Sequence, residues 1–330
     1  MKGAIEPIKI GRSDIYKTKM YPPYLIAEIG VNYYDIAKKE NIELIEAAKH
    51  MIDGAKQAGC NAVKFQTYKA EKLASKYATA FWDRKIIKEK NQVELYKRYD
   101  KLTCDDYKEL IKYTKSKNLD FATTVFDEDL VDFFDEYLQF YKIASADIAN
   151  YILIKKIAKK NKPIILSTGA ALVEEIFRAI RWIEEEENYN IIPLHCVLSY
   201  PTKLADANLG YIKHLDNKID YPVGYSCHVK PEKGMPHIIA AWLLGAKVIE
   251  KHFTLDKTLP GNDHYHAFDV EDGIIFNRTT KKIMTLYGKD YIREIIESEK
   301  TARKNARRSI FTKKDMKKGD TITTENITAK

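Results

Sequence analysis

The 330-residue sequence predicts a (β/α)8 barrel, also called a TIM barrel, and three observations support this fold class. Eight short runs rich in apolar and β-branched residues alternate with helix-like segments. Most of these runs are apolar almost throughout, which is typical of parallel strands that are covered on both faces. From the third run onward, the starts lie 21, 22, 28, 30 and 27 residues apart, which is the length of one βα unit.

The expected elements alternate along the chain. Strands are expected at 24–29, 62–66, 120–124, 141–144, 163–167, 191–195, 221–225 and 248–253. Helices are expected at 41–58, 107–116, 128–137, 151–160, 172–187 and 232–245. Thr103, with Asp106 three residues later, predicts a capping box. The longer stretch 68–102 predicts extra structure between the second and third strands. No G-x-G-x-x-G motif follows the first strand, so a dinucleotide-binding sheet is not favoured.

Composition limits the class of protein. Hydrophobic residues make up 45% of the chain, which is enough for a substantial core. The net charge of +8 comes from basic residues mostly interspersed with acidic ones, which indicates a solvated surface rather than a nucleic-acid partner. No apolar run reaches the length of a membrane span, and the N-terminus lacks a secretory pattern. Four isolated cysteines and no C-x-x-C pair favour a cytoplasmic location.

In a barrel of this kind, chemistry belongs to the C-terminal ends of the strands. Two lysines and three hydroxyls collect there and predict a site for a phosphate and a carboxylate: Lys64, Lys142, Ser145, Ser167 and Ser226. A single lysine in such a place is more often an ion-pair partner, and it is the convergence of several groups that favours a binding site.

Two histidines end neighbouring strands. His228 and His252 are one βα unit apart, and two imidazoles with open positions suit a divalent cation. A lone histidine would more often be a core residue. Glu28, Asp147 and Asp263 are candidates for acid–base catalysis or for binding sugar hydroxyls. Other polar residues at or near these strand ends complete the candidate set: Gln66, Thr123, Tyr200 and Glu250.

Seven motifs then carry a resemblance, in order along nearly the whole chain: AEIGVN (27–32), KFQT (64–67), KIAS (142–145), LSTG (166–169), LHC with YPT (194–202), GYSCH (224–228) and EKHFTLD (250–256). Together they resemble the sialic acid synthase family, which comprises the N-acetylneuraminate, legionaminate and pseudaminate synthases. Cys227 departs from the usual pattern by replacing an aspartate, Asp147 by replacing a glutamate, and Tyr33 by replacing a histidine.

The resemblance implies a reaction and a domain plan. Family members condense phosphoenolpyruvate with an open-chain N-acetylmannosamine-type amino sugar, giving a nonulosonic (sialic) acid and phosphate, and they need Mn²⁺ or Mg²⁺. The barrel domain is expected over 1–296. Residues 297–330 would then be a linker and a partial antifreeze-like (SAF) segment, and the protein would form a homodimer.

The resemblance also implies residue roles. It makes His228 and His252 the metal ligands. It assigns phosphoenolpyruvate to Lys64, Lys142, Ser145, Ser167 and Ser226, with Thr123 beside them. Glu28 would lie near the attacking water and the aldehyde, and the amino sugar would contact Gln66, Asp147, Tyr200 and Asp263. Glu250 belongs to the family motif and is grouped with the catalytic residues.

Two other readings stay open. A related phosphoenolpyruvate-dependent synthase of the ketodeoxyoctulosonate-phosphate or deoxyheptulosonate-phosphate type would need a second phosphate site, and the strand ends show no second lysine cluster. A non-enzymatic carbohydrate- or nucleic-acid-binding protein could use the basic C-terminal tail, but the sequence lacks an RNA-binding signature.

Overall fold

The computed structural model describes residues 6–80, 88–261, 263–288 and 293–330. The chain divides into two compact units, Met1–Leu286 and Tyr287–Lys330. The second unit contains helix α12 (Glu297–Asn305) and an antiparallel pair of strands, β11 (Ile310–Thr312) and β12 (Ile327–Ala329). The expected boundary at residue 296 and the antifreeze-like nature of the tail stay predictions. Among the described helices, none combines the length and hydropathy that a membrane crossing needs.

The first unit contains the predicted barrel. Eight parallel strands close on themselves in the order β10-β3-β4-β5-β6-β7-β8-β9. Their bounds are β3 Tyr24–Gly30, β4 Ala62–Thr67, β5 Asp120–Val125, β6 Tyr141–Ile143, β7 Ile164–Ser167, β8 Ile191–Cys196, β9 Gly224–Cys227 and β10 Val248–His252. All eight predicted strands are therefore confirmed. Strand β9, predicted at 221–225, begins at Gly224 because Pro222 has no N–H to donate to a neighbouring strand.

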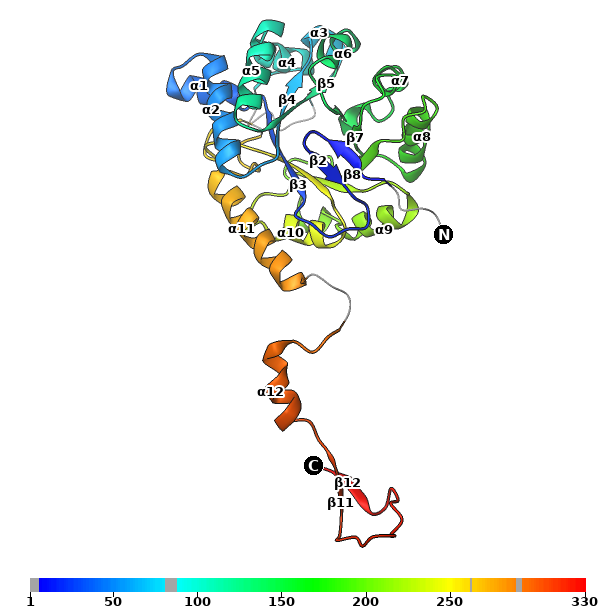
Figure 1. Cartoon of the computed structure of the whole chain (residues 1–330). Helices are drawn as coiled ribbons and strands as arrows, with labels where there is room; N and C mark the ends of the chain where they lie inside the picture. The colour runs from blue at the N-terminus through cyan, green and yellow to red at the C-terminus, as the bar shows by residue number, and fades with distance from the viewer. Residues whose placement is uncertain (1–5, 81–87, 262, 289–292) are drawn as a thin grey trace. The chain divides into compact units, whose positions relative to one another are not determined.

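Helices surround the barrel strands (Figure 1). Their bounds are α1 Tyr33–Glu40, α2 Leu44–Gln57, α5 Cys104–Ser116, α6 Glu128–Asp135, α7 Tyr151–Ala158, α8 Val173–Glu184, α9 Gly210–Lys218, α10 Pro236–Leu243 and α11 Val270–Tyr287. The capping box predicted at Thr103 is present: Asp106 N–H donates to Thr103 Oγ1, and Thr103 N–H donates to Asp106 Oδ2. This reciprocal pair satisfies two backbone donors at the start of α5.

Extra structure lies between β4 and β5, as the length of that stretch predicts. It includes α3 (Ala70–Leu73) and α4 (Gln92–Tyr99), while 81–87 fall outside the described residues. Two short 3-10 helices also lie among the described residues of the first unit: η1 (Ser145–Asp147) after β6 and η2 (Leu204–Asp206) after β8.

A hairpin that the sequence analysis missed covers the N-terminal side of the barrel interior. Strands β1 (Ile8–Ile10) and β2 (Ser13–Ile15) pair antiparallel, and their isoleucines join a buried cluster with lumen-facing barrel residues. We call this cluster the floor of the barrel: Ile8, Ile10, Ile15, Tyr24, Ile26, Ala62, Ala122, Phe140, Ile165, Ile192, Leu194 and Val248. It is separate from the larger core between strands and helices.

The turn of this hairpin is fitted closely to β5. Gly11 has φ +53°, and a Cβ atom there would lie 1.9 Å from Asp120 Oδ2. Asp120 is held in place because it accepts hydrogen bonds from the Arg12 backbone N–H (3.1 Å) and the Tyr24 hydroxyl (2.8 Å). Position 11 therefore requires glycine both for its backbone conformation and for space.

Candidate functional site at the barrel mouth

The polar residues predicted at the strand ends share the barrel lumen with the floor. Side chains two positions apart on a strand point to the same face, so Glu28 follows Ile26 into the lumen and Lys64 follows Ala62. The same alternation applies to the other strands. We call the lumen-facing residues beyond the floor the mouth: Glu28, Lys64, Gln66, Thr124, Lys142, Ser167, Cys196, Ser226, His228, Glu250 and His252.

Lys64 lies at the centre of a buried hydrogen-bond network. Its ammonium is 2.5 Å from Glu28 Oε2 and donates to Thr124 Oγ1 at 2.9 Å. Gln66 Nε2 donates to the other oxygen of Glu28 at 2.8 Å. Glu28 is therefore fixed from two sides by β4, which places a rigid carboxylate and ammonium pair at the mouth.

Glu250 connects the two predicted anion-binding lysines. Its Oε1 lies 3.8 Å from Lys64 Nζ and 3.7 Å from Lys142 Nζ, and the Ser226 hydroxyl donates to the same oxygen at 3.4 Å. The two lysines that the sequence analysis assigned to an anion site therefore do not form an isolated cationic patch, because Glu28 and Glu250 accompany them. The lysines can favour an anion only where it approaches them more closely than Glu250 does.

Burial affects these charges unequally. It raises the pKa of Glu28 even though Lys64 lies beside it. Burial also opposes ionisation of Glu250, but Lys142 and Lys64 outweigh it and hold the pKa of Glu250 below its ordinary value. Burial lowers the pKa of Lys142 more than Glu250 raises it. Lys142 is thus the buried ammonium that an incoming anion would stabilise most.

The predicted hydroxyls converge from neighbouring strands. The Ser145 hydroxyl accepts from the Gly169 backbone N–H at 2.9 Å, which joins η1 to the loop after β7. Ser167 Oγ is buried and has no hydrogen-bond partner among the described residues. An unsatisfied buried hydroxyl costs stability, so Ser167 is well suited to bind a ligand oxygen.

Thr123 lies elsewhere. Its hydroxyl is 2.7 Å from Thr67 Oγ1, and both residues alternate with the lumen-facing positions of their strands. The adjacent Thr124 is the threonine that contacts Lys64. The structure therefore does not bring Thr123 together with the other predicted ligands, because the two-residue period of β5 assigns the lumen to its neighbour.

Three imidazoles meet above the charged layer. The ring centroids of His228 and His252 lie 5.6 Å apart, and His266, which the sequence analysis did not select, is 4.8 Å from His252 and 6.2 Å from His228. The Tyr200 ring packs against His228 with a centroid distance of 4.1 Å. Tyr200 thus packs against the histidine cluster, and its backbone carbonyl accepts a hydrogen bond from the Tyr265 hydroxyl.

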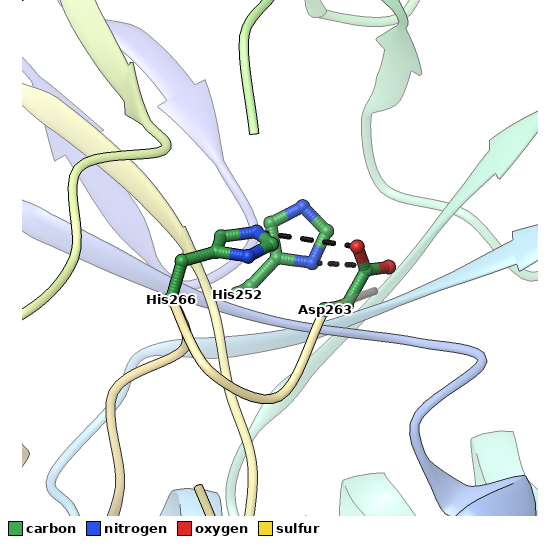
Figure 2. A group of neighbouring side chains, drawn as sticks. All are labelled: His252, Asp263 and His266. Atoms are coloured by element: carbon green, nitrogen blue, oxygen red, sulfur yellow. Dashed lines mark ion pairs between the residues drawn. The ribbon is translucent and has the colours of Figure 1, made fainter. Parts of the chain in front are cut away.

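Asp263 faces two of these rings (Figure 2). Its Oδ2 lies 3.6 Å from His252 Nδ1, and its Oδ1 lies 4.0 Å from His266 Nε2. One donor atom from each of His252, Asp263 and His266 lies within 4.8 Å of the others. Burial, together with the charge of Glu28, raises the pKa of Asp263 to about 7.

The histidines suit a cation. Burial lowers the pKa of His228 to about 4 and, with His266 and His228 adding to burial, lowers that of His252 well below its ordinary value. Neutral imidazole is the form that ligates metals. His228 Nδ1 contacts the Val197 carbonyl at 2.8 Å, which leaves its Nε2 for a ligand. His252 Nδ1 is buried without a hydrogen-bond partner among the described residues.

Two of the positions that depart from the family pattern differ in their surroundings. Asp147 Oδ1 accepts from Asn150 at 3.2 Å, while its Oδ2 is buried without a hydrogen-bond partner among the described residues, and burial raises its pKa. Cys227 faces away from the lumen, where its Sγ accepts from Lys251 Nζ at 3.5 Å. No carboxylate lies within ion-pair distance of Lys251 in the described part of the chain, and burial lowers the pKa of Lys251.

A closed parallel barrel with buried acids, bases and imidazoles at the C-terminal ends of its strands defines a barrel enzyme. The model of the NeuB family matches residues 51–291, and the chain belongs to this family. It is an enzyme of the sialic acid synthase type, a transferase class that condenses phosphoenolpyruvate with a sugar. The resemblance drawn from the seven motifs is thereby confirmed.

The chain is similar to several proteins over most of their length. The uncharacterized protein MJ1065 of Methanocaldococcus jannaschii is 35% identical over 327 residues, which cover 99% of this chain and 89% of the relative. The N,N'-diacetyllegionaminic acid synthase of Campylobacter jejuni is 35% identical over 311 residues, covering 93% and 89%. The crystal structure of an N-acetylneuraminic acid synthetase from Leptospira borgpetersenii has a TM-score of 0.75 at 30% identity and covers 91% of this chain and 95% of that one.

Proposed function

We propose that the chain catalyses a divalent-metal-dependent condensation of phosphoenolpyruvate with the open-chain aldehyde of an N-acetylmannosamine-type amino sugar. The products would be a nonulosonic acid and inorganic phosphate. The observation that carries the proposal is the convergence of two buried lysines, several hydroxyls and two imidazoles in one barrel mouth, with the imidazole of His266 packed against them.

The atoms balance without an oxidant or reductant. Carbon 3 of phosphoenolpyruvate bonds to the aldehyde carbon, and the aldehyde oxygen becomes a hydroxyl. One water adds at carbon 2, and the bond between carbon 2 and the bridging oxygen breaks as phosphate leaves. The resulting carbon 2 is the keto group of the product.

The inner part of the mouth suits phosphoenolpyruvate. Lys142 and Lys64 would hold its negative groups, and Ser167 offers a buried hydroxyl with an unused hydrogen-bonding capacity. Ser145 lies in η1 directly after β6, and Ser226 lies on β9 beside Glu250. In the assignment from the resemblance, Thr123 joins this group, but its contact with Thr67 favours Thr124 for that place.

Glu28 is placed to handle water. Because burial raises its pKa, its carboxylate binds a proton more readily than an exposed glutamate does. Gln66 and Lys64 fix its two oxygens, so its orientation is set before substrates arrive. We assign to Glu28 the acceptance of a proton from the attacking water, and to Glu250 the alignment of the two lysines.

The sugar would lie against the outer part of the mouth. Asp147 has a buried carboxylate oxygen that can accept from a hydroxyl or amide group. Gln66, Tyr200 and Asp263 would complete the sugar contacts. His228 and His252 would hold the Mn²⁺ or Mg²⁺ ion, and a bound cation would polarise the aldehyde oxygen as a Lewis acid.

The remaining features are proposed with the function. We expect a cytoplasmic homodimer whose residues 297–330 form a partial antifreeze-like segment. Light scattering coupled to size-exclusion chromatography tests the assembly, because a monomeric mass at micromolar concentration would contradict the dimer.

Product formation tests the reaction directly. Purified chain, phosphoenolpyruvate and Mn²⁺ are incubated with N-acetylmannosamine or with a 2,4-diacetamido hexose, and phosphate release is followed alongside mass spectrometry. We expect phosphate and a nine-carbon 2-keto acid in equal amounts. Release with arabinose 5-phosphate or erythrose 4-phosphate, and with none of the amino sugars, would overturn the proposed acceptor class.

A further inference from the structure

His266 lies in the loop between β10 and α11, fully buried against the histidines of the barrel mouth. Its ring meets that of His252 at 63° with a centroid distance of 4.8 Å, and it lies 5.6 Å from the Tyr200 ring. It is therefore part of the same cluster, although its position in the sequence is 14 residues beyond the end of β10.

Asp263 lies on the same loop and shares this space. Its two oxygens point to different imidazoles, one toward His252 and one toward His266 (Figure 2). The separations of 3.6 and 4.0 Å are close to the spacing of roughly 3 to 3.5 Å between donor atoms that bind one cation at about 2.1 Å. All three donor atoms lie within 4.8 Å of one another, so side-chain rotations that also bring the two imidazoles closer together would place them around one ion.

We infer that His266 is a third imidazole ligand of the catalytic cation, in addition to His228 and His252. The inference deepens the proposed function and rests on it for the role of the ion, whereas binding of the ion can be measured without turnover. It raises the number of imidazole donors from two to three, with His228 as the remaining ring and the Asp263 carboxylate beside them.

The donor set predicts which ions bind best. Imidazole nitrogen favours ions such as Co²⁺, Ni²⁺ and Zn²⁺, while Mg²⁺ prefers oxygen donors and retains water. A site with three imidazoles should therefore discriminate strongly in favour of the nitrogen-preferring ions. Two imidazoles alone would leave more of the coordination shell to water and substrate oxygens, and would discriminate less.

Metal binding in the absence of substrates tests the inference. Equilibrium dialysis of the full chain with Co²⁺ and with Mg²⁺ gives the two dissociation constants for the wild type and for His266→Phe, which keeps an aromatic ring against Tyr200. We expect His266→Phe to weaken Co²⁺ binding by about 100-fold and Mg²⁺ binding by no more than about threefold. Pulsed electron paramagnetic resonance with Mn²⁺ should lose the signal of one imidazole nitrogen.

His237 provides the matched control. It is a buried histidine on α10, outside the metal-binding group. His237→Phe should leave Co²⁺ affinity within about threefold of the wild type. Circular dichroism establishes that each variant is folded, and His266→Gln, which keeps a polar side chain, is used if the phenylalanine variant does not fold.

The outcomes separate this inference from the proposed function. Co²⁺ affinity unchanged by replacing His266 but lost in His252→Ala would overturn the third-ligand inference and leave the synthase proposal intact. Tight Co²⁺ binding that requires His266, with no phosphate release from any amino sugar, would support the ligand and overturn the proposed function. Weak binding of every ion by the wild type would overturn the inference.

Discussion

The floor and the mouth of the barrel are built on the same strands, yet they are opposite in chemistry. In the floor, lumen-facing side chains such as Ile26, Phe140 and Ile165 are apolar and sealed by the N-terminal hairpin. Two residues further along the same strands, Glu28, Lys142 and Ser167 take their places. The difference teaches that stability and reactivity are separated along the strand axis, so substitutions in the two layers should have different consequences.

The largest effect is expected at Lys142. Replacing it in Lys142→Met removes an ammonium from the proposed phosphoenolpyruvate site, and phosphate release should fall by about 10³-fold, equivalent to roughly 4 kcal/mol. The free energy of unfolding should change by no more than about 1 kcal/mol. Burial already opposes the charge of Lys142, and in the variant Glu250 still has Lys64 as a cationic partner. Steady-state kinetics and urea denaturation measure the two quantities. A large stability loss would show that the mouth supports the fold as the floor does.

Phe140→Ala should produce the reverse pattern. The side chain is fully buried in the floor and packs edge-on against Tyr24. Its loss should lower the free energy of unfolding by about 3 to 4 kcal/mol through lost burial and a cavity. The folded fraction should keep its KM for phosphoenolpyruvate within about twofold. Urea denaturation and initial-rate measurements check this, and a strongly raised KM would mean that the two layers are coupled.

Cation binding gives a smaller effect that sharpens the same comparison. At a concentration about 100 times the Kd, a divalent cation should raise the free energy of unfolding by about 2.7 kcal/mol, and a chelator should reverse the change. The increment should be the same in Phe140→Ala within about 0.5 kcal/mol, because floor and mouth are separate. Calorimetry with and without chelator measures both increments. Unequal increments would contradict independence of the layers.

The smallest effect is expected at the rim of the hairpin. The Arg12 side chain is 47% exposed, and its Nε donates to Asp120 Oδ1 at 3.1 Å. Arg12→Ala should therefore cost less than about 1 kcal/mol. Gly11→Ala is the informative companion, since both its positive φ and the nearby Asp120 predict a larger loss. Equal losses in the two variants would contradict this account of the turn.

Much of this architecture could be predicted from the sequence. Eight covered parallel strands need continuous apolar runs, and such runs are visible without knowledge of tertiary contacts. The capping box at Thr103 could be predicted because both of its partners lie within four residues. The hairpin at 8–15 was missed, although Ile8 and Ile10 alternate with Lys9 before Gly11 and such alternation ending in glycine is a hairpin signal.

The candidate site was predictable in its location more than in its contacts. Strand ends indicated the mouth, but only the register of β5 distinguishes Thr124 from Thr123. The charge balance set by Glu250 depends on distances between three strands, which no local pattern contains. His266 was missed because it lies on a loop, and the spacing of Asp263, His264 and His266 in D-H-Y-H was the available signal.

The apolar floor closes the barrel lumen at the N-terminal ends of its strands. In the described part of the chain, the hairpin covers the N-terminal end of the lumen, so a molecule that approaches Lys142 and Ser226 from the C-terminal end passes the level of His228 and His252. A ligand bound at the level of Lys142 and Ser226 is therefore covered by a ligand bound at the level of His228 and His252. Because both ligands would enter and leave at the C-terminal end, the ligand that binds deeper is expected to bind first and to dissociate last.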